Sequence, residues 1–258
     1  RVLLKGALAE LFDEGAARFD ASMAELTTFR IGGPADVLVE PRTADEARVV
    51  LAACRRLGVA VRVMGLGSDV LVADEGLRCV VVRIAESLSQ VEVDGERMHV
   101  EAGASNADVA RRACEEGLAG YEFACGIPGT VGGALRMNAG SRDEWIGSRV
   151  VSVTTLSPGK GLVRRDGDQI AWGYRSSSFA SDEVIVECEL SVEPADPFFI
   201  RGKMEASHAR RKKTQPLSLP SCGSVFRNPE GAPVGALIEE AGLKGLRIGG
   251  AQVSEVHA

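Results

Sequence analysis

The chain has 258 residues and a mass of 27.2 kDa, and its hydrophobic fraction of 45% is enough for a core in one large or two small domains. A formal charge of −6 excludes the broad basic face that a general nucleic-acid or membrane-surface binder needs. No stretch approaches the roughly 20 apolar residues of a membrane span. Because charges also interrupt the apolar N-terminal run, unlike a signal peptide, we expect a cytoplasmic protein.

The first half of the chain carries helix caps and turn signals. Thr43 and Glu46 form a capping box, apolar residues then recur at helical spacing, and Gly58 ends the predicted helix. The next predicted elements, each bounded by turn or cap residues, are a strand over 59–65, a strand over 79–84, a hairpin over 91–103 and a helix over 105–117.

The second half is richer in strands and ends in helices. The predicted elements are strands over 150–156, 161–165 and 184–193, a long helix that starts at Asp196–Pro197 and ends before Pro216, and a short helix within 233–245. Since hairpins exclude a purely parallel sheet, we expect an α+β fold. We place a domain boundary between 192 and 196. A last domain of roughly 60 residues is at the lower limit of independent stability, so we expect it to be incomplete.

The cysteines and histidines give no metal-site pattern. The cysteines lie apart, without a CxxC pair and mostly among apolar neighbours, and the three histidines are equally dispersed. We therefore predict buried free thiols and no metal site. The cysteines are Cys54, Cys79, Cys114, Cys125, Cys188 and Cys222.

Two glycine-rich loops are the strongest signal for a ligand site. GLGSD at 65–69 lacks the third glycine of a Rossmann fingerprint, and residues 70–76 read as a strand and not as a helix. GIPGTVGG at 126–133 lacks the Gly-Lys-Ser/Thr ending of a P-loop. Glycines let successive N–H groups converge on phosphate oxygens, and Ser68 and Thr130 can add donors. One such loop alone is more often a tight turn; two loops favour a diphosphate held between them.

Five motifs in order along the chain resemble the UDP-N-acetylenolpyruvoylglucosamine reductase family. The motifs are TTFRIGGPAD (27–36), GLGSDVLVADEG (65–76), GIPGTVGGALRMNAG (126–140), WGYRSSSF (172–179) and CGSVFRNP (222–229). The resemblance implies an FAD-binding domain of the vanillyl-alcohol-oxidase (PCMH) type over 1–194, in two α+β subdomains divided near 85–90. It also implies an α+β substrate-binding domain over 195–258, incomplete as given.

The resemblance also implies which residues bind FAD. The expected cofactor contacts are Arg30, Gly32, Gly65, Gly67, Ser68, Asp69, Gly126, Pro128, Gly129, Thr130, Gly132, Gly133 and Asn138. Arg30 could otherwise be a surface arginine on a strand. The family usually has Asn at the position of Asp69, so one donor to the cofactor becomes an acceptor. SRDEWIGS after MNAG also departs from the family pattern.

Two residues are expected to act on the substrate. Reduction of an enol ether by a flavin needs a hydride at one carbon, and a fixed cation and a proton donor for the neighbouring carbon, which bears the carboxylate. The resemblance assigns the cation to Arg175 and the proton donor to Ser224. From the residues alone, Arg175 could pair with a carboxylate on an edge strand, and Ser224 could be a turn hydroxyl. The family also uses a late glutamate, which no position here matches, Glu255 included.

The substrate itself is expected to be UDP-N-acetylglucosamine enolpyruvate, with NADPH as the reductant. Tyr174, Lys213 and Asn228 are the expected substrate contacts, although the cations at 210–213 also suit a solvated helix end. Cys222 is a rival nucleophile. We expect a monomer that binds neither nucleic acid nor membrane. The alternatives are another FAD-dependent oxidase or dehydrogenase of the same fold, and a non-catalytic nucleotide-sugar or flavin-binding module.

Overall fold

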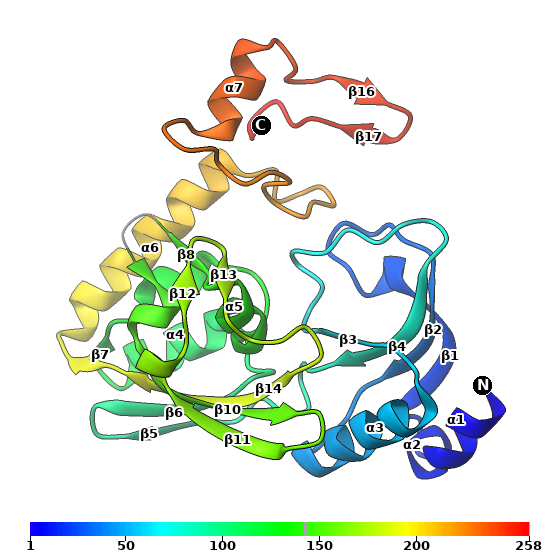
Figure 1. Ribbon diagram of the computed structural model, residues 1–258. Coiled ribbons are helices and arrows are strands. Elements are labelled where there is room, and N and C mark those ends of the chain that lie inside the picture. Colours follow the sequence, from blue (N-terminus) through cyan, green and yellow to red (C-terminus); the bar gives the residue numbers. More distant parts are fainter. Residues whose placement is uncertain (142–143, 258) are drawn as a thin grey trace.

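The computed structural model describes residues 1–141 and 144–257 and contains two main sheets that lie side by side, a long helix and a separate C-terminal segment (Figure 1). No helix among the described residues is long and apolar enough to cross a membrane.

The first sheet is built from residues near the N-terminus. Its order is β1-β2-β4-β3, with β1 antiparallel to β2, and with β2 and β3 both parallel to β4. The elements are α1 (Val2–Ala7), α2 (Ala9–Asp13), β1 (Ala17–Ser22), the 3₁₀ helix η1 (Met23–Glu25), β2 (Pro34–Val39), α3 (Ala44–Leu57), β3 (Val61–Met64) and β4 (Leu77–Arg83). The predicted cap of α3 is confirmed, because Thr43 accepts a hydrogen bond from Glu46 N and Gly58 is left-handed.

The second sheet is antiparallel throughout, in the order β11-β10-β14-β6-β5. Its strands are β5 (Val91–Asp94), β6 (Arg97–Glu101), β10 (Val150–Ser157), β11 (Gly161–Asp166) and β14 (Val184–Ser191). The helices and short elements around it are α4 (Asn106–Glu115), β7 (Leu118–Ala119), η2 (Glu122–Gly126), α5 (Val131–Met137), β8 (Gly140–Ser141), β9 (Glu144–Trp145), η3 (Ile146–Ser148), η4 (Gly167–Gln169), β12 (Trp172–Gly173), β13 (Ser176–Ser177) and β15 (Glu193–Pro194).

The core joins both sheets. One cluster of buried side chains runs from the N-terminal helices to the end of β14, and a smaller one lies around Met23 and Leu38. Val80 and Val82 of β4 belong to the first cluster and Val81 to the second, because successive side chains of a strand point to opposite faces. Each fully buried valine contributes about 1.5–3 kcal/mol.

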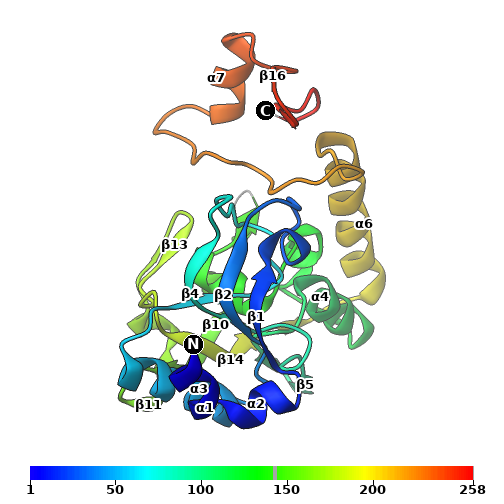
Figure 2. The same cartoon turned by 90° about the vertical axis from the view of Figure 1, so that its right-hand side faces the viewer.

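The C-terminal part is packed very differently. α6 (Pro197–Thr214) lies along the body, and Ile200 is its one buried residue. After it come α7 (Val234–Glu240), β16 (Arg247–Ile248) and β17 (Ala251–Gln252), and none of the residues 201–257 is buried. Figures 1 and 2 show α7, β16 and β17 beyond the end of α6 and apart from both sheets.

Two sequence expectations for the loops need correction. Residues 70–76 form no strand, although Val72 is buried. They run beside the loop at 30–34, where Gly33 N donates to Ala73 O at 2.9 Å and a side chain on Gly33 would collide with Asp74 O. The second glycine loop contains a helix, α5, that was not predicted, because two glycines in its first turn lower its intrinsic propensity.

The other predicted helices, strands and turns are confirmed. Asp94 ends β5 of the predicted hairpin, Ser105 caps α4, and Asp196 caps α6 by accepting from Phe198 N. Five of the six cysteines are buried and free, as expected, and Cys222 is half-buried.

Candidate active site

The two glycine loops are in direct contact with each other. A Cβ on Gly65 would lie 2.2 Å from Thr130 Oγ1, and a Cβ on Gly129 would lie 3.5 Å from Ser68 Oγ. Glycine at 65 is therefore required by the neighbouring loop of the protein itself. These glycines can therefore serve close packing and ligand binding at once, because close packing brings together the two loops that would bind the ligand.

The first loop leaves several backbone donors without a partner. Gly67 is left-handed at φ +65°, and its carbonyl accepts from Thr28 N at 3.1 Å. Within the described residues, the N–H groups at 66–69 donate no hydrogen bond, and neither do those of Gly129 and Thr130. Successive free N–H groups around a left-handed residue suit a phosphate. The donor set of the two loops therefore fits the diphosphate of a dinucleotide such as FAD.

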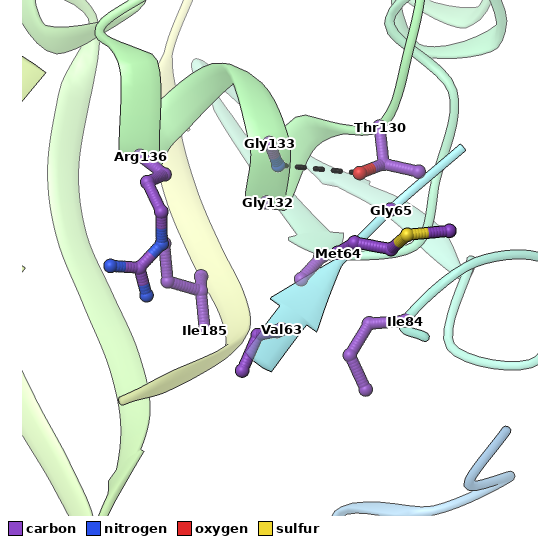
Figure 3. Close-up of a pocket in the computed structure, with 10 residues that line it drawn as sticks. Val63, Met64, Gly65, Ile84, Thr130, Gly132, Gly133, Arg136 and Ile185 are labelled. Atoms are coloured by element: carbon purple, nitrogen blue, oxygen red, sulfur yellow. Dashed lines mark hydrogen bonds between the residues drawn. The ribbon is translucent and has the colours of Figure 1, made fainter. Parts of the chain in front are cut away.

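A cavity of about 50 Å³ lies where the loops meet the two sheets (Figure 3). Four of the predicted cofactor residues line it, together with apolar side chains that the motifs did not indicate. The lining is Val63, Met64, Gly65, Ile84, Ala102, Thr130, Gly132, Gly133, Arg136 and Ile185. Thr130 also caps α5, accepting from Gly133 N at 3.3 Å. A side chain on Gly132 would be tight, because its Cβ would lie 3.1 Å from Ala102 O.

Arg136 connects this cavity to the loop before β14. Its guanidinium donates to Ala180 O at 2.8 Å and to the carbonyls of Phe179 and Glu183. Burial lowers the pKa of Arg136, and the charge of Glu183 opposes that shift. No sequence pattern indicates this role, because the three acceptors are backbone atoms more than 40 positions away.

Arg175 lies in the turn of the hairpin formed by β12 and β13. Its backbone is left-handed at φ +51°, which is uncommon for a residue with a side chain, and one guanidinium nitrogen donates to Gly140 O at 3.2 Å. The guanidinium carbon also lies 5.2 Å from the centre of the Tyr174 ring. The predicted cation is thus held at a turn by contacts on two sides.

Asn138 holds this hairpin in place. The residue is buried, and its side chain donates to Gly173 O at 2.9 Å and accepts from Gly147 N at 3.1 Å. Ser177 Oγ adds a bond to Arg136 O at 2.7 Å. Because both ends of the Asn138 amide bind the protein, this geometry supports a positioning role for Asn138 and gives no support to the predicted cofactor contact.

The segment that carries Ser224, residues 221–228, contacts Thr28 and the hairpin of Arg175. Thr28 Oγ1 donates to Ser221 O at 2.8 Å, and an Arg227 guanidinium nitrogen donates to Arg175 O at 3.2 Å. Asn228 Nδ2 donates to Tyr174 Oη at 3.1 Å. Ser224 itself is exposed. Arg175, Tyr174 and Asn228 therefore belong to one contact region, and Ser224 lies on the stretch of chain between two of its contacts, Ser221 and Arg227.

The acidic and thiol groups nearby have shifted pKa values. Burial raises the pKa of Asp69, against the opposing charges of Arg175 and Arg227. Burial also raises the pKa of the Cys222 thiol, and the Asp69 charge adds to that shift. Because the thiolate is the reactive form of cysteine, this environment disfavours Cys222 as a nucleophile.

Some predicted site residues lie away from the loop contact. Gly126 faces α6, where a Cβ would lie 3.2 Å from Ser207 Oγ and where Arg211 donates to its carbonyl. Gly32 packs against Val72, and Lys213 is exposed near the end of α6. Pro128 lies one residue before Gly129, in the second loop.

Arg30 and Asn106 lie close to the loops. Arg30 is exposed in the turn next to Thr28. Asn106 was not predicted: its Nδ2 donates to Gly129 O at 3.3 Å, and its Oδ1 accepts from the buried Tyr121 at 2.8 Å. A polar residue after a helix cap offered no signal for this role.

The described residues contain no group of three or more His, Cys, Asp or Glu side chains that could hold a metal ion. The chemistry of this region rests on backbone amides, arginines and a hydroxyl.

Comparisons with known proteins match both parts of the chain. A family model described as FAD binding domain matches residues 35–167, and one described as UDP-N-acetylenolpyruvoylglucosamine reductase, C-terminal domain, matches residues 215–258. The UDP-N-acetylenolpyruvoylglucosamine reductase of Halalkalibacterium halodurans is 41% identical over 245 residues, which are 95% of this chain and 81% of that protein.

Solved structures show the same likeness. The crystal structure of the corresponding reductase from Thermus caldophilus aligns with a TM-score of 0.81 at 32% identity, over 93% of this chain and 85% of that one. Phl p 4, a grass pollen allergen with glucose dehydrogenase activity, aligns with a TM-score of 0.60 at 16% identity, over 75% of this chain and 44% of that one. The second likeness is one of fold alone.

Proposed function

This chain belongs to the UDP-N-acetylenolpyruvoylglucosamine reductase family, and we propose that it reduces the enolpyruvyl group of UDP-N-acetylglucosamine enolpyruvate to give UDP-N-acetylmuramate. The product is a precursor of peptidoglycan, so the enzyme serves cell-wall synthesis. The observation that carries this proposal is the meeting of the Arg175 hairpin and the Ser224 segment beside Asp69 at the end of the first glycine loop.

The cofactor is FAD, and the two glycine loops are its proposed binding site. The free amides of 66–69, Gly129 and Thr130 would bind its diphosphate, and the cavity beside α5 would receive an apolar part of it. When bound, FAD supplies the hydride for the substrate after it has been reduced by NADPH. The chain's part is to hold the cofactor and to exclude water from its face.

Arg175 is the proposed electrostatic stabiliser. Negative charge develops on the carbon that bears the substrate carboxylate, and a fixed guanidinium can bind that carboxylate with two parallel hydrogen bonds. Its bond to Gly140 O and its contact with Tyr174 limit how far it can move. A preorganised cation of this kind costs no rearrangement during the reaction.

Ser224 is the proposed proton donor. A hydroxyl is a weak acid, but it suffices when it is held within reach of a strongly basic carbon. The exposed Ser224 has no acceptor among the described residues, so its proton is available to a bound substrate. Tyr174, Lys213 and Asn228 are proposed to bind the nucleotide sugar.

The proposal extends to organisation and location. Residues 1–194, in two parts divided near 85–90, would bind the cofactor, and residues 195–258 would belong to the substrate-binding domain. NADPH and the nucleotide sugar would use one site in turn. We propose a monomeric enzyme in the cytoplasm, where both of these nucleotides are made.

The test separates the two half-reactions. Ser224→Ala should leave reduction of the flavin by NADPH nearly intact and slow its reoxidation by the enolpyruvyl sugar by about 10²–10⁴-fold, the usual contribution of a general acid. Ser218→Ala, an exposed serine of the same segment, is the matched control and should behave as the wild type. Equal losses in both half-reactions would refute the role of Ser224.

A further inference from the structure

Thr28 makes a reciprocal contact with the segment that carries Ser224. Its hydroxyl donates to Ser221 O at 2.8 Å, and its carbonyl accepts from Ser221 N at 3.2 Å. The hydroxyl also lies 3.5 Å from Ser68 O, but a single proton favours the shorter and stronger bond to Ser221.

Thr28 also contacts the first glycine loop. Its N–H donates to Gly67 O at 3.1 Å, in the loop whose free amides fit the cofactor diphosphate. One residue therefore ties the Ser224 segment to the cofactor loop by backbone and side chain at once. The contact joins positions 193 residues apart in the sequence.

A second tie lies on the other side of Ser224. Arg227 donates to Arg175 O at 3.2 Å, in the turn that presents the proposed stabilising cation. Ser224 stands midway between Ser221 and Arg227, three residues from each. Three residues span at most about 10–11 Å, so the two ties keep Ser224 close to both the cofactor loop and Arg175.

These ties matter because little else holds the segment. None of the residues 201–257 is buried, so hydrophobic packing does not fix its position. Loss of one tie would lengthen the free stretch of chain around Ser224 and lower the effective concentration of its hydroxyl at the substrate.

We propose that Thr28 is a positioning residue for proton transfer, which docks the Ser224 segment onto the cofactor loop. The inference rests on the proposed function, because it assigns the position of the proton donor in that reaction. It predicts that the Thr28 hydroxyl acts only when the substrate is reduced and not when the cofactor is.

The experiment compares three variants of the FAD-loaded enzyme. Thr28→Val removes the hydroxyl and keeps the shape, Thr28→Ser keeps the hydroxyl, and Thr154→Val is a control on β10, away from the site. Reduction by NADPH and reoxidation by the enolpyruvyl sugar are measured separately. Hydrogen–deuterium exchange of the peptide around Ser221 gives a readout that does not depend on activity.

The loss of one exposed hydrogen bond corresponds to about 3–10-fold in the population of the docked segment. Thr28→Val should therefore slow reoxidation about 3–10-fold, leave reduction by NADPH within about twofold, and speed exchange at Ser221. Thr28→Ser and Thr154→Val should match the wild type in all three measurements.

Unchanged exchange at Ser221 in Thr28→Val, or equal losses in both half-reactions, would overturn the inference. A wild type that is never reoxidised by the enolpyruvyl sugar would instead refute the proposed function. In that case exchange at Ser221 would still decide whether Thr28 docks the segment.

Discussion

The body of the molecule and its C-terminal segment hold their parts of the candidate site by different means. In the body, the glycine loops approach each other so closely that a Cβ at Gly65 would lie 2.2 Å from Thr130 Oγ1, and a continuous core lies beneath them. In the segment from 201 to 257 no residue is buried, and Ser224 depends on a few hydrogen bonds to Thr28, Arg175 and Tyr174. Close packing of side chains and backbone thus fixes the loops that are proposed to bind the cofactor, whereas individual hydrogen bonds position the proposed proton donor.

This difference predicts which changes each side tolerates. Close-packed regions lose stability when volume or buried charge changes, whereas regions held by exposed hydrogen bonds change function with little effect on stability. Changes in the body should therefore appear in unfolding experiments, and changes around the segment in the rate of one half-reaction.

The largest effect on the body is expected at Glu183. This buried carboxylate accepts hydrogen bonds from Arg165, Thr155 and Ser157 and from the backbone of Ala180. Glu183→Gln would leave the partly buried Arg165 cation without its counter-charge and should lower the free energy of unfolding by about 2–4 kcal/mol, measured by urea denaturation at pH 7.

The same variant makes a prediction about pH. Burial raises the pKa of Glu183, but the hydrogen bonds of Arg165, Thr155 and Ser157 outweigh it and leave the pKa below its ordinary value. A carboxyl of this kind stabilises the fold above its unfolded pKa and loses that contribution as the pH falls through its folded pKa. The wild type and Glu183→Gln should therefore converge in acid. Glu187→Gln, exposed on β14, is the control and should change stability by less than about 0.5 kcal/mol.

A smaller effect is expected when the contact between the loops is overfilled. Gly65→Ala would push Thr130 away, which should cost about 1–3 kcal/mol in unfolding and weaken FAD binding. Gly202→Ala in α6 meets open space and should stabilise the protein by up to about 1 kcal/mol. Thermal unfolding and flavin fluorescence would measure both. FAD affinity unchanged in Gly65→Ala would contradict the placement of the cofactor between the loops.

The smallest effect is expected at Asp69, where the two regions meet. Its charge faces Arg175 and Arg227 and so competes with the substrate carboxylate for Arg175. Asp69→Asn should lower the KM for the enolpyruvyl sugar about 2–5-fold and leave unfolding unchanged. Because burial raises the pKa of Asp69, the wild type should approach the variant as the pH falls through that pKa. A higher KM in the variant would show that Asp69 assists binding.

Local patterns were enough to predict most elements of the fold. The caps at Thr43, Ser105 and Asp196 are read from neighbouring residues and form as expected, although the Glu46 side chain accepts from Arg42 N and does not close the predicted capping box. α5 was missed because its glycines are set by contacts with Ala102 and Thr130, which are tertiary. The strand expected over 70–76 was wrong, because Val72 is buried in the hydrophobic cluster beside the first sheet and against Gly32 without pairing as a strand.

Site residues that lie in a family motif could be predicted from the sequence. Residues that position the site by bonding backbone atoms far away in the sequence could not. The resemblance named Arg175 and Ser224, but Thr28, Asn106 and Arg136 act through carbonyls that no sequence pattern specifies. Asn138 lies within a motif, yet its amide binds Gly173 and Gly147. Such positioning residues become visible only once the chain is folded.

The most direct test of the account is an anaerobic absorption titration of the FAD-loaded protein. NADPH is added first and the enolpyruvyl sugar second, while the flavin band is followed. The proposed function predicts that the band bleaches with NADPH and returns with the sugar. A protein that cannot be loaded with FAD, or a band that the sugar fails to restore, would contradict it.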